Sequence, residues 1–202
     1  MDQIKVELIT QPNLKAALLA VGKPYKKEGT IEILHKVAKH FKHESVLEHI
    51  NFSWNVDGSS RLELQEHMRH RIASPTVQST RYTLKEMFDE LPNVIDYESL
   101  AFFINKWCCL PLSLKEDKNA HEAIYSLIYS ASCAKRMYGN DTAKYLLPEC
   151  LRTSFVWTLN LRSMLNFLKL RKSQSAHFEI RQIANEMERI LSETETKTLL
   201  EE

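Results

Sequence analysis

Residues 69–82 of the chain read RHRIASPTVQSTRY, and this stretch decides how the rest of the sequence is interpreted. It opens with three basic side chains, Arg69, His70 and Arg71, which we expect at the end of a helix that begins after Ser60 and runs to about Arg71. Cations favour the C-terminal end of any helix because they complement its last carbonyl groups. The triplet alone therefore does not indicate a binding site, and the residues after it have to be considered.

The second part of this stretch predicts a loop rich in hydrogen-bond donors. Ser74 precedes Pro75, which biases its backbone toward extended geometry. We therefore expect residues 72–78 to form an irregular loop that presents Ser79, Arg81 and backbone N–H groups. Such donors beside three basic side chains suit a phosphate and a planar ring that carries carbonyl groups.

The composition is that of an ordinary folded domain. The chain has 202 residues, of which 44% are hydrophobic and 26% are charged, so we expect a single domain over residues 1–202. Lys and Arg together number 27 and Asp and Glu 26, which leaves no global positive field for a nucleic-acid partner. A bound phosphate must then be met by a local cluster of cations.

The chain shows neither a targeting segment nor a membrane segment. Residues 1–10, MDQIKVELIT, lack a basic segment followed by a long apolar run, and no apolar stretch approaches the roughly 20 residues needed to span a bilayer. We expect a cytoplasmic protein without a membrane partner. The cysteines, Cys108, Cys109, Cys133 and Cys150, form no C-x-x-C pair and are expected to be reduced, buried thiols.

Hydrophobic periodicity predicts two strands in the first half of the chain. Apolar and polar residues alternate over residues 3–9 and again over residues 50–56, so both segments are expected in one sheet. Between them, apolar residues recur at helical spacing after Thr30, which is suited to be the N-cap of that helix.

The second half is predicted to be mostly helical. We therefore expect an α+β fold in which a central, mostly antiparallel sheet is flanked by helices and the C-terminal half is rich in helix. Three apolar stripes at helical spacing indicate the helices: Ile124, Leu127, Ile128 and Ala131; Trp157, Leu161, Met164, Leu165 and Leu168; and Ile180, Ile183, Ala184, Met187 and Leu191.

The four glycines form neither a G-x-G-x-x-G pattern nor a P-loop. A dinucleotide would have to be held by side chains and helix ends. On the helix predicted around residue 164, Arg162 and Asn166 lie four apart, away from the apolar stripe. Taken alone, these two residues also fit an ordinary solvated face.

The pattern Arg69-His70-Arg71, seven residues, then Ser79-Thr80-Arg81-Tyr82 resembles the signature of the flavin-dependent thymidylate synthases. The resemblance extends over most of the chain. Further segments carry it: His43–His49 (HESVLEH), Ser60-Arg61, Asn160-Leu161-Arg162 with Asn166, Leu170-Arg171, and Ala176–Ile180 (AHFEI).

The chain departs from the family pattern at several positions, which suggests a divergent subgroup. These are Glu66 where Gln is common, Thr76 and Val77 where Asn and Glu are common, Lys144 where an Arg commonly binds the substrate phosphate, and His177 and Phe178 in place of Gln and Trp. Lys144 still supplies a positive charge, although as a point charge in place of a planar fork. No role of the usual carboxylate carries over to Val77.

The resemblance implies reductive methylation of 2′-deoxyuridine 5′-monophosphate (dUMP) to the thymidine nucleotide dTMP, a step of de novo thymidylate synthesis. FAD is the implied cofactor, 5,10-methylenetetrahydrofolate the carbon donor and NADPH the reductant. A homotetramer with sites shared between subunits is also implied, and no metal is.

The site residues follow from the same resemblance. Arg171 and Ser79 are the catalytic candidates: Arg171 would stabilise negative charge on the pyrimidine, because a guanidinium cannot accept a proton at neutral pH. Ser79 would orient that ring, because no His-Asp relay is evident beside it. The implied FAD ligands are His43, Ser45, Arg69, His70, Arg71, Asn160, Leu161, Arg162 and Asn166. The implied dUMP ligands are Glu66, Arg69, Val77, Gln78, Ser79, Thr80, Arg81, Lys144 and Arg171.

Two other functions stay open from the residues alone. Thr76, Val77 and Lys144 would suit a nucleotide-binding protein that kept the fold but lost turnover. In a cysteine-dependent thymidylate synthase, Cys150 would be the nucleophile, although nothing around it in the sequence suggests activation.

Overall fold

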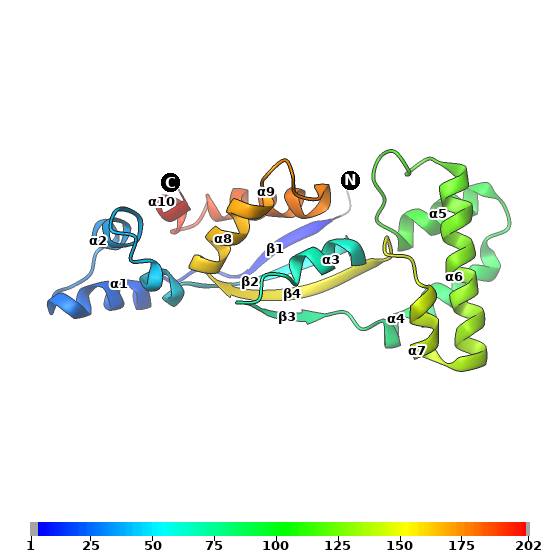
Figure 1. Cartoon of the computed structure of the whole chain (residues 1–202), viewed down its shortest axis with the longest axis horizontal. Coiled ribbons are helices and arrows are strands. Elements are labelled where there is room, and N and C mark those ends of the chain that lie inside the picture. Colours follow the sequence, from blue (N-terminus) through cyan, green and yellow to red (C-terminus); the bar gives the residue numbers. More distant parts are fainter. Residues whose placement is uncertain (1–3, 201–202) are drawn as a thin grey trace. The chain divides into compact units, whose positions relative to one another are not determined.

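The computed structural model describes residues 4–200 and contains one four-stranded sheet. The strands are β1 (Lys5–Thr10), β2 (Asn51–Ser60), β3 (Ser74–Val77) and β4 (Arg152–Asn160), in the spatial order β1-β2-β4-β3 (Figure 1). β1 pairs antiparallel with β2, with Val6 opposite Val56 and Leu8 opposite Trp54. The predicted α+β fold around a central sheet is confirmed; Gln3, the first residue of the predicted strand, lies outside the described residues.

Alternating burial explains why the two long strands form. In β2, Phe52, Trp54 and Val56 are wholly buried and alternate with more exposed residues. In β4, Trp157 is buried in the same way, so its placement on a helical stripe was wrong. The helix begins only at Leu161, because its N-terminus is capped by the residue before it.

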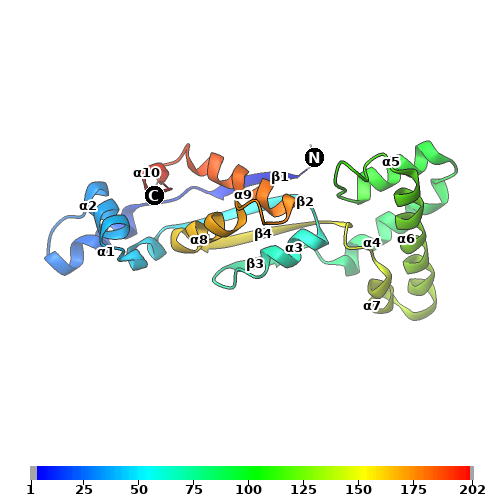
Figure 2. The same cartoon turned by 45° about the horizontal axis from the view of Figure 1, so that its top comes forward.

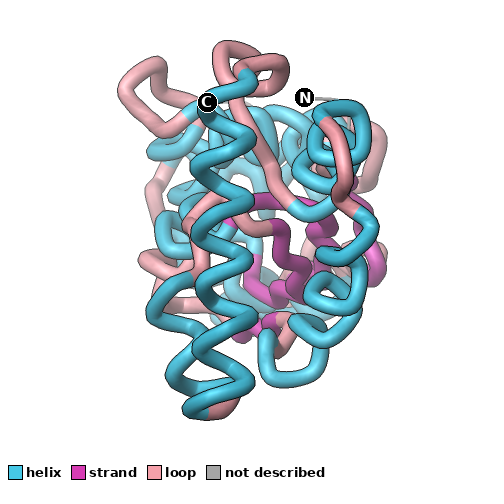
Figure 3. The backbone as a smooth tube through the Cα atoms, turned by 90° about the vertical axis from the view of Figure 1, so that its right-hand side faces the viewer, coloured by secondary structure: helices cyan, strands magenta, loops and turns pink. Residues whose placement is uncertain are grey.

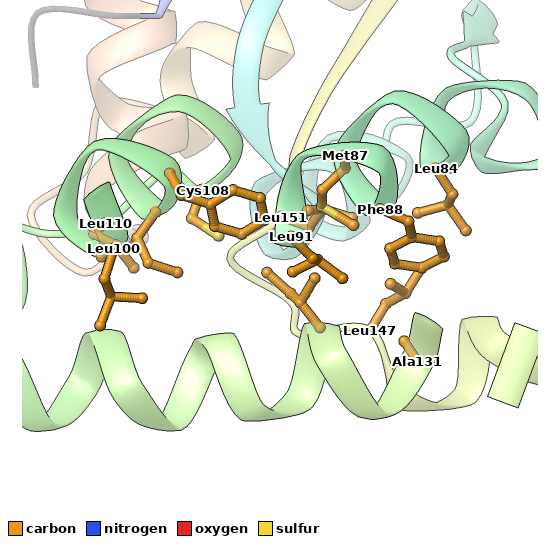
Figure 4. Packing of buried hydrophobic residues seen from close by; sticks show 13 residues of the cluster. Leu84, Met87, Phe88, Leu91, Leu100, Cys108, Leu110, Ala131, Leu147 and Leu151 are labelled. Carbon is orange, nitrogen blue, oxygen red and sulfur yellow. The ribbon is translucent and has the colours of Figure 1, made fainter. Parts of the chain in front are cut away.

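The chain divides into two compact units, of which the first comprises Gly58–Gln65 and Val77–Ser154 together with Ile4. Its helices are α4 (Thr80–Glu90), η4 (Leu91–Asn93), α5 (Tyr97–Trp107), α6 (Lys118–Tyr138), α7 (Asn140–Ala143) and η5 (Lys144–Leu146). Leu84, Met87 and Phe88 of α4 point toward α6 in the core of this unit (Figure 4).

Among the described residues, the second unit comprises 5–57, 66–76 and 155–200, and it holds most residues of the sheet. Its helices are α1 (Lys15–Gly22), η1 (Lys23–Tyr25), α2 (Ile31–His35), η2 (Lys36–His40), η3 (Glu44–His49), α8 (Leu161–Arg171), α9 (Phe178–Leu191) and α10 (Lys197–Leu200). α9 packs along β1, and α8 and α9 lie on the same face of the sheet (Figures 1 and 2). The expectation of one domain stays a prediction.

Predicted helices of the second unit are largely confirmed. Thr30 caps α2, with its Oγ1 accepting from Ile33 N at 3.4 Å. The stripe from Ile180 to Leu191 is wholly buried in α9, and helices dominate the C-terminal half as expected. Helix also predominates over strand in the described chain (Figure 3). In the first unit, the apolar stripe predicted on α6 is buried or partly buried except at Leu127, whose exposed fraction is 45%.

Two boundaries near the signature stretch differ from the prediction. α3 (Arg61–His67) is capped by Ser60, whose Oγ accepts from Glu63 N at 3.0 Å, but it ends four residues before Arg71. The expected irregular loop contains β3, because this segment adds to the edge of the sheet beside β4. Pro75 is compatible with an edge strand, where one missing N–H leaves no neighbour unpaired.

The cysteines are free, as expected, but only Cys108 and Cys109 are buried, whereas Cys133 and Cys150 are partly exposed. Among residues 4–200, no helix combines the length and the apolar character needed to cross a bilayer. Within the same described range, no group of three His, Cys, Asp or Glu side chains is placed to hold a metal ion.

Candidate functional site

A cavity of about 1500 Å³ lies within the second unit, between α8, the segment that follows α3 and the η2–η3 region. The lining residues include Arg171 and six of the nine residues predicted to bind FAD: Arg69, His70, Arg71, Asn160, Arg162 and Asn166. The structure therefore brings together two parts of the sequence that carry the signature, about ninety residues apart.

The other three predicted FAD residues do not line this cavity. His43 is the N-cap residue of η3, and Ser45 is an exposed residue of that helix. Leu161 is wholly buried, and its N–H donates to Ile50 O at 2.8 Å. Its side chain is part of the core, whereas the adjacent Asn160 and Arg162 line the cavity.

The N-terminus of α8 positions the first polar residues of the cavity. Asn160 caps the helix, with its Oδ1 accepting from Ser163 N at 2.9 Å. Arg162 lies in the first turn and donates to Glu48 Oε1 at 2.7 Å, and its Nε lies 3.4 Å from Glu44 Oε2. These two carboxylates restrict the Arg162 guanidinium at the wall of the cavity.

Arg171 ends α8, and its guanidinium is held on three sides. Nε donates to His70 Nε2 at 2.8 Å, Nη1 to Glu66 Oε2 at 2.8 Å, and Nη2 to the Glu66 backbone carbonyl at 3.0 Å. Only 15% of the Arg171 side chain is exposed. A partly buried cation with three fixed hydrogen bonds is preorganised for electrostatic work on a bound group.

His70 is held in place by aromatic neighbours. Its ring centroid lies 4.9 Å from that of Phe167 and 6.4 Å from that of Trp157, in edge-to-face geometry with both. Burial, together with the nearby positive charge of Arg171, lowers the pKa of His70 from 6.5 to about 4. The imidazole is therefore neutral at pH 7.

Glu66 is the common anion of two predicted ligand arginines. Besides Arg171, it pairs with Arg69, whose Nη1 lies 3.1 Å from Glu66 Oε1. Burial opposes the ionised form of Glu66, but the hydrogen bond from Arg171 and the charges of both arginines outweigh it and lower the pKa of Glu66 below 4.5. Arg69 lies beyond the end of α3, and its pairing with Glu66 brings it to this cluster.

The remaining predicted dUMP residues belong to the first unit. Ser79 caps α4 by accepting from Arg81 N at 3.4 Å. Arg81 Nη2 lies 3.2 Å from Asp141 Oδ2, and Lys144 Nζ lies 2.9 Å from Asp141 Oδ1. Arg81 and Lys144 are thus brought together, and hydrogen bonds from Lys144 and Arg81 lower the pKa of Asp141 below 3.8.

The other residues of the Val77–Arg81 segment that are predicted to bind dUMP lie at the end of β3 and the start of α4. Val77 is the half-buried last residue of β3, and Gln78 N donates to Ser154 O at 2.8 Å. Thr80 begins α4. Gln78 and Ser79 lie between β3 and α4, and the backbone of Ser79 is extended.

Several residues that line the cavity were not predicted from the sequence. Eight Lys and Arg side chains line the cavity against three Glu side chains, and four of these cations were not predicted: Lys39, Lys42, Lys169 and Lys172. Lys169 follows Asn166 by three positions on α8, so helical spacing could have identified it. Lys39 and Lys42 come from the η2 region and carry no periodic signal; Lys42 has a positive φ of 59°.

Comparison with known proteins finds relatives over most of the chain. Residues 8–194 match the family model described as thymidylate synthase complementing protein. The chain is 41% identical over 155 residues to a flavin-dependent thymidylate synthase of Campylobacter jejuni, covering 76% of this chain and 72% of that protein. It is 36% identical over 157 residues to the Helicobacter pylori protein of that description, covering 76% and 73%.

A solved structure extends the similarity to the fold. The crystal structure of thymidylate synthase X (ThyX) from Helicobacter pylori with FAD and dUMP has a TM-score of 0.81 and 27% sequence identity, covering 98% of this chain and 96% of that one. The family match includes residues of both compact units. The chain belongs to the flavin-dependent thymidylate synthase family of enzymes.

Proposed function

We propose that the chain catalyses the reductive methylation of dUMP to dTMP, with FAD as cofactor, 5,10-methylenetetrahydrofolate as carbon donor and NADPH as reductant. The observation that carries the proposal is the fixed Arg171 guanidinium in the wall of a cation-rich cavity. Family membership supports the same reaction.

The cavity residues fit FAD in size and in charge. A volume of about 1500 Å³ exceeds the roughly 300–1,000 Å³ of ordinary ligand sites, which suits a long dinucleotide. Arg69, Arg71 and Arg162 would hold the diphosphate, since a planar guanidinium offers paired donors to phosphate oxygens. Asn160 and Asn166 would supply uncharged hydrogen bonds. When bound and reduced, FAD supplies the hydride for the reaction.

Two groups of residues would hold dUMP. One group is Glu66, Arg69 and Arg171, and the other is the Val77–Arg81 segment with Lys144. Lys144 and Arg81 carry the positive charge suited to the phosphate.

Arg171 has a defined task in this chemistry. The five-carbon of uracil is a poor nucleophile until negative charge on the ring nitrogen and carbonyl oxygens is stabilised. Because its guanidinium stays protonated, Arg171 acts by charge and hydrogen bonding, not as a base. Ser79 orients the ring: its Oγ accepts from Arg81 N, and that hydrogen bond offers no means of removing the hydroxyl proton.

The working assembly is proposed to be a homotetramer whose sites are shared between subunits. A ligand that binds across subunits stabilises the assembled native state. Sedimentation of the FAD-loaded protein should show tetramers, and the unfolding midpoint should rise with protein and flavin concentration. Full activity from a monomer at nanomolar concentration would exclude shared sites.

The proposed reaction is tested by two measurements on one preparation. The purified protein should be yellow with an oxidised-flavin spectrum, and addition of dUMP, methylenetetrahydrofolate and NADPH should yield dTMP on chromatography. Bound flavin without dTMP would favour the alternative of a nucleotide-binding protein that lost turnover, for which Thr76 and Val77 are the sequence argument. Absence of flavin binding would refute the cofactor assignment.

A further inference from the structure

The hydrogen bond between Arg171 and His70 restricts both partners. A guanidinium has N–H donors and no acceptor, so Arg171 Nε can only donate in its 2.8 Å contact with His70 Nε2. His70 Nε2 must therefore offer a lone pair. A neutral imidazole with its lone pair on Nε2 carries its hydrogen on Nδ1.

We propose that His70 is a positioning residue for Arg171, held as the Nδ1–H tautomer, so that one ring orients Arg171 through Nε2 and donates to the cavity ligand through Nδ1. The ligand atom is an acceptor oxygen or nitrogen of a bound nucleotide cofactor or substrate. This assignment of the ligand rests on the proposed function, whereas the tautomer and the orientation of Arg171 do not.

The position of the ring makes this linkage possible. His70 lines the cavity, and its Nδ1 forms no hydrogen bond to any residue in the described range 4–200. Phe167 and Trp157, both wholly buried, meet the imidazole at interplanar angles of 77° and 76°. A ring fixed by two buried aromatic side chains presents its free N–H in one direction, and it cannot turn away without losing these contacts.

Glu66 completes the arrangement on the other side of the guanidinium. The Glu66 carboxylate accepts from Arg171 Nη1, and the Glu66 backbone carbonyl accepts from Nη2. His70 Nε2 accepts from Nε. Arg171 is thus located by two residues that belong to the same chain segment, on either side of the end of α3. A shift of the ligand against His70 would be transmitted to Arg171 through a single ring, because the imidazole contacts both. The low pKa of His70, about 4, agrees with a neutral ring at pH 7.

The tautomer can be measured without ligand and without activity. In nitrogen-15 spectra of histidine-labelled protein at pH 7, the signals of His70 should show a protonated Nδ1 and an unprotonated Nε2. The Arg171 Nε–H should exchange slowly with solvent. A protonated Nε2, or an imidazolium at this pH, would overturn the proposal whatever the protein catalyses.

Two substitutions of His70 test the roles of its two ring nitrogens separately. The amide oxygen of His70→Gln can reach the place of Nε2, whereas the amide nitrogen of His70→Asn can occupy the place of Nδ1. We expect the Gln variant to keep the slow Arg171 Nε–H exchange but to bind ligand more weakly. The Asn variant should bind ligand better than the Gln variant, lose the slow exchange, and show a maximal rate lowered on the order of a hundredfold, the scale of a misplaced catalytic group.

Separate titrations with FAD and with dUMP identify the ligand. Weaker FAD binding by the Gln variant places the acceptor on the cofactor, and weaker dUMP binding places it on the substrate. If both variants match the wild type in ligand affinity and in Arg171 exchange, His70 does not link ligand and arginine. If the wild type forms no dTMP, the proposed function fails, while the exchange and tautomer measurements still decide this inference.

Discussion

The carboxylate of Glu66 accepts from Arg171 Nη1 at 2.8 Å, and its backbone carbonyl accepts from Nη2 at 3.0 Å, across 105 positions of the chain. Arg171 is therefore oriented by a residue that the family resemblance identified only as a ligand of dUMP. Because Glu66 also pairs with Arg69, one anion organises two of the cations on which the proposed chemistry depends.

The role of Arg171 is tested by Arg171→Ala. We expect a folded, flavin-containing protein in which methylation falls on the order of a hundredfold or more, the scale of losing one charge-stabilising donor. Glu66 keeps Arg69 as a partner, so the fold should survive. Arg171→Lys keeps the positive charge but lacks the planar set of N–H donors, so it should have a higher rate than the Ala variant. Near-normal turnover in the Ala variant would refute the assigned role.

Substitution of Glu66 separates charge from hydrogen bonding. Glu66→Gln keeps an acceptor for Arg171 Nη1 and removes the negative charge, whereas Glu66→Ala removes the acceptor as well. For the Ala variant we expect about a tenfold or larger loss of rate, in line with the roughly 1.5–3 kcal/mol of a hydrogen bond to a charged group. The Gln variant should lose less. Steady-state rates of both variants, measured side by side, check this order, and equal rates for the two would contradict it.

The lowered pKa of His70 predicts a specific dependence of stability on pH. Above 6.5 the ring is neutral in both the folded and the unfolded chain, so it adds no pH dependence. Between 6.5 and about 4 the unfolded chain binds a proton that the folded chain does not, so stability should decrease as the pH falls through this window. Arg171, His67 and Glu66 are the charged or titratable groups that act on His70.

The measurement compares the unfolding midpoint in denaturant for wild type and His70→Gln. The lowered pKa of Glu66 affects stability only below 4.5, so the comparison belongs between pH 4.5 and 6.5. Wild type should lose more stability than the variant across this interval. Parallel curves would show that His70 titrates normally in the folded protein.

Lys144 is predicted to hold the phosphate of dUMP. Lys144→Ala would remove a charge-assisted hydrogen bond worth about 1.5–3 kcal/mol, or roughly ten- to 150-fold in substrate binding. The effect should appear mainly in the Michaelis constant for dUMP, because the phosphate is remote from the reacting carbon. Asp141 keeps Arg81 as its partner, so the local structure should persist.

The matched control for this position is Lys118→Ala. Lys118 lies in the same compact unit and pairs with Glu122 at 3.8 Å, but it belongs to the surface of α6. Its variant should have an unchanged dUMP saturation curve. If the curve for Lys144→Ala also superimposes on that of wild type, the phosphate is held elsewhere.

Local interactions account for the elements that could be predicted. Thr30 and Ser60 cap the helices after them because a side-chain oxygen satisfies an N–H of the first turn wherever the helix packs. α9 and β2 each bury one face, and the apolar residues of that face recur at the spacing of a helix or a strand. This periodicity can be read from the sequence. These features depend on residues near each other in the chain.

The misplaced elements depend on partners distant in the chain. Trp157 has helical spacing from Leu161, yet it lies in β4, because the sheet offers a neighbour on each side of that strand. The segment Ser74–Val77 has no strong strand pattern and becomes β3 only because β4 lies at that edge. Neither neighbour can be identified from local spacing.

The sequence by itself determined the family, two of the strands, some of the helices and the arginines that line the cavity, because motif spacing and periodicity are properties of nearby residues. Only the tertiary structure decided how those arginines are paired: Glu66 between Arg69 and Arg171, and His70 against Arg171. It also decided which lysines join the cavity wall. The reason is physical, since hydrogen bonds between charged groups act over about 3 Å, and which groups come that close depends on the packing of α8 against segments a hundred residues away.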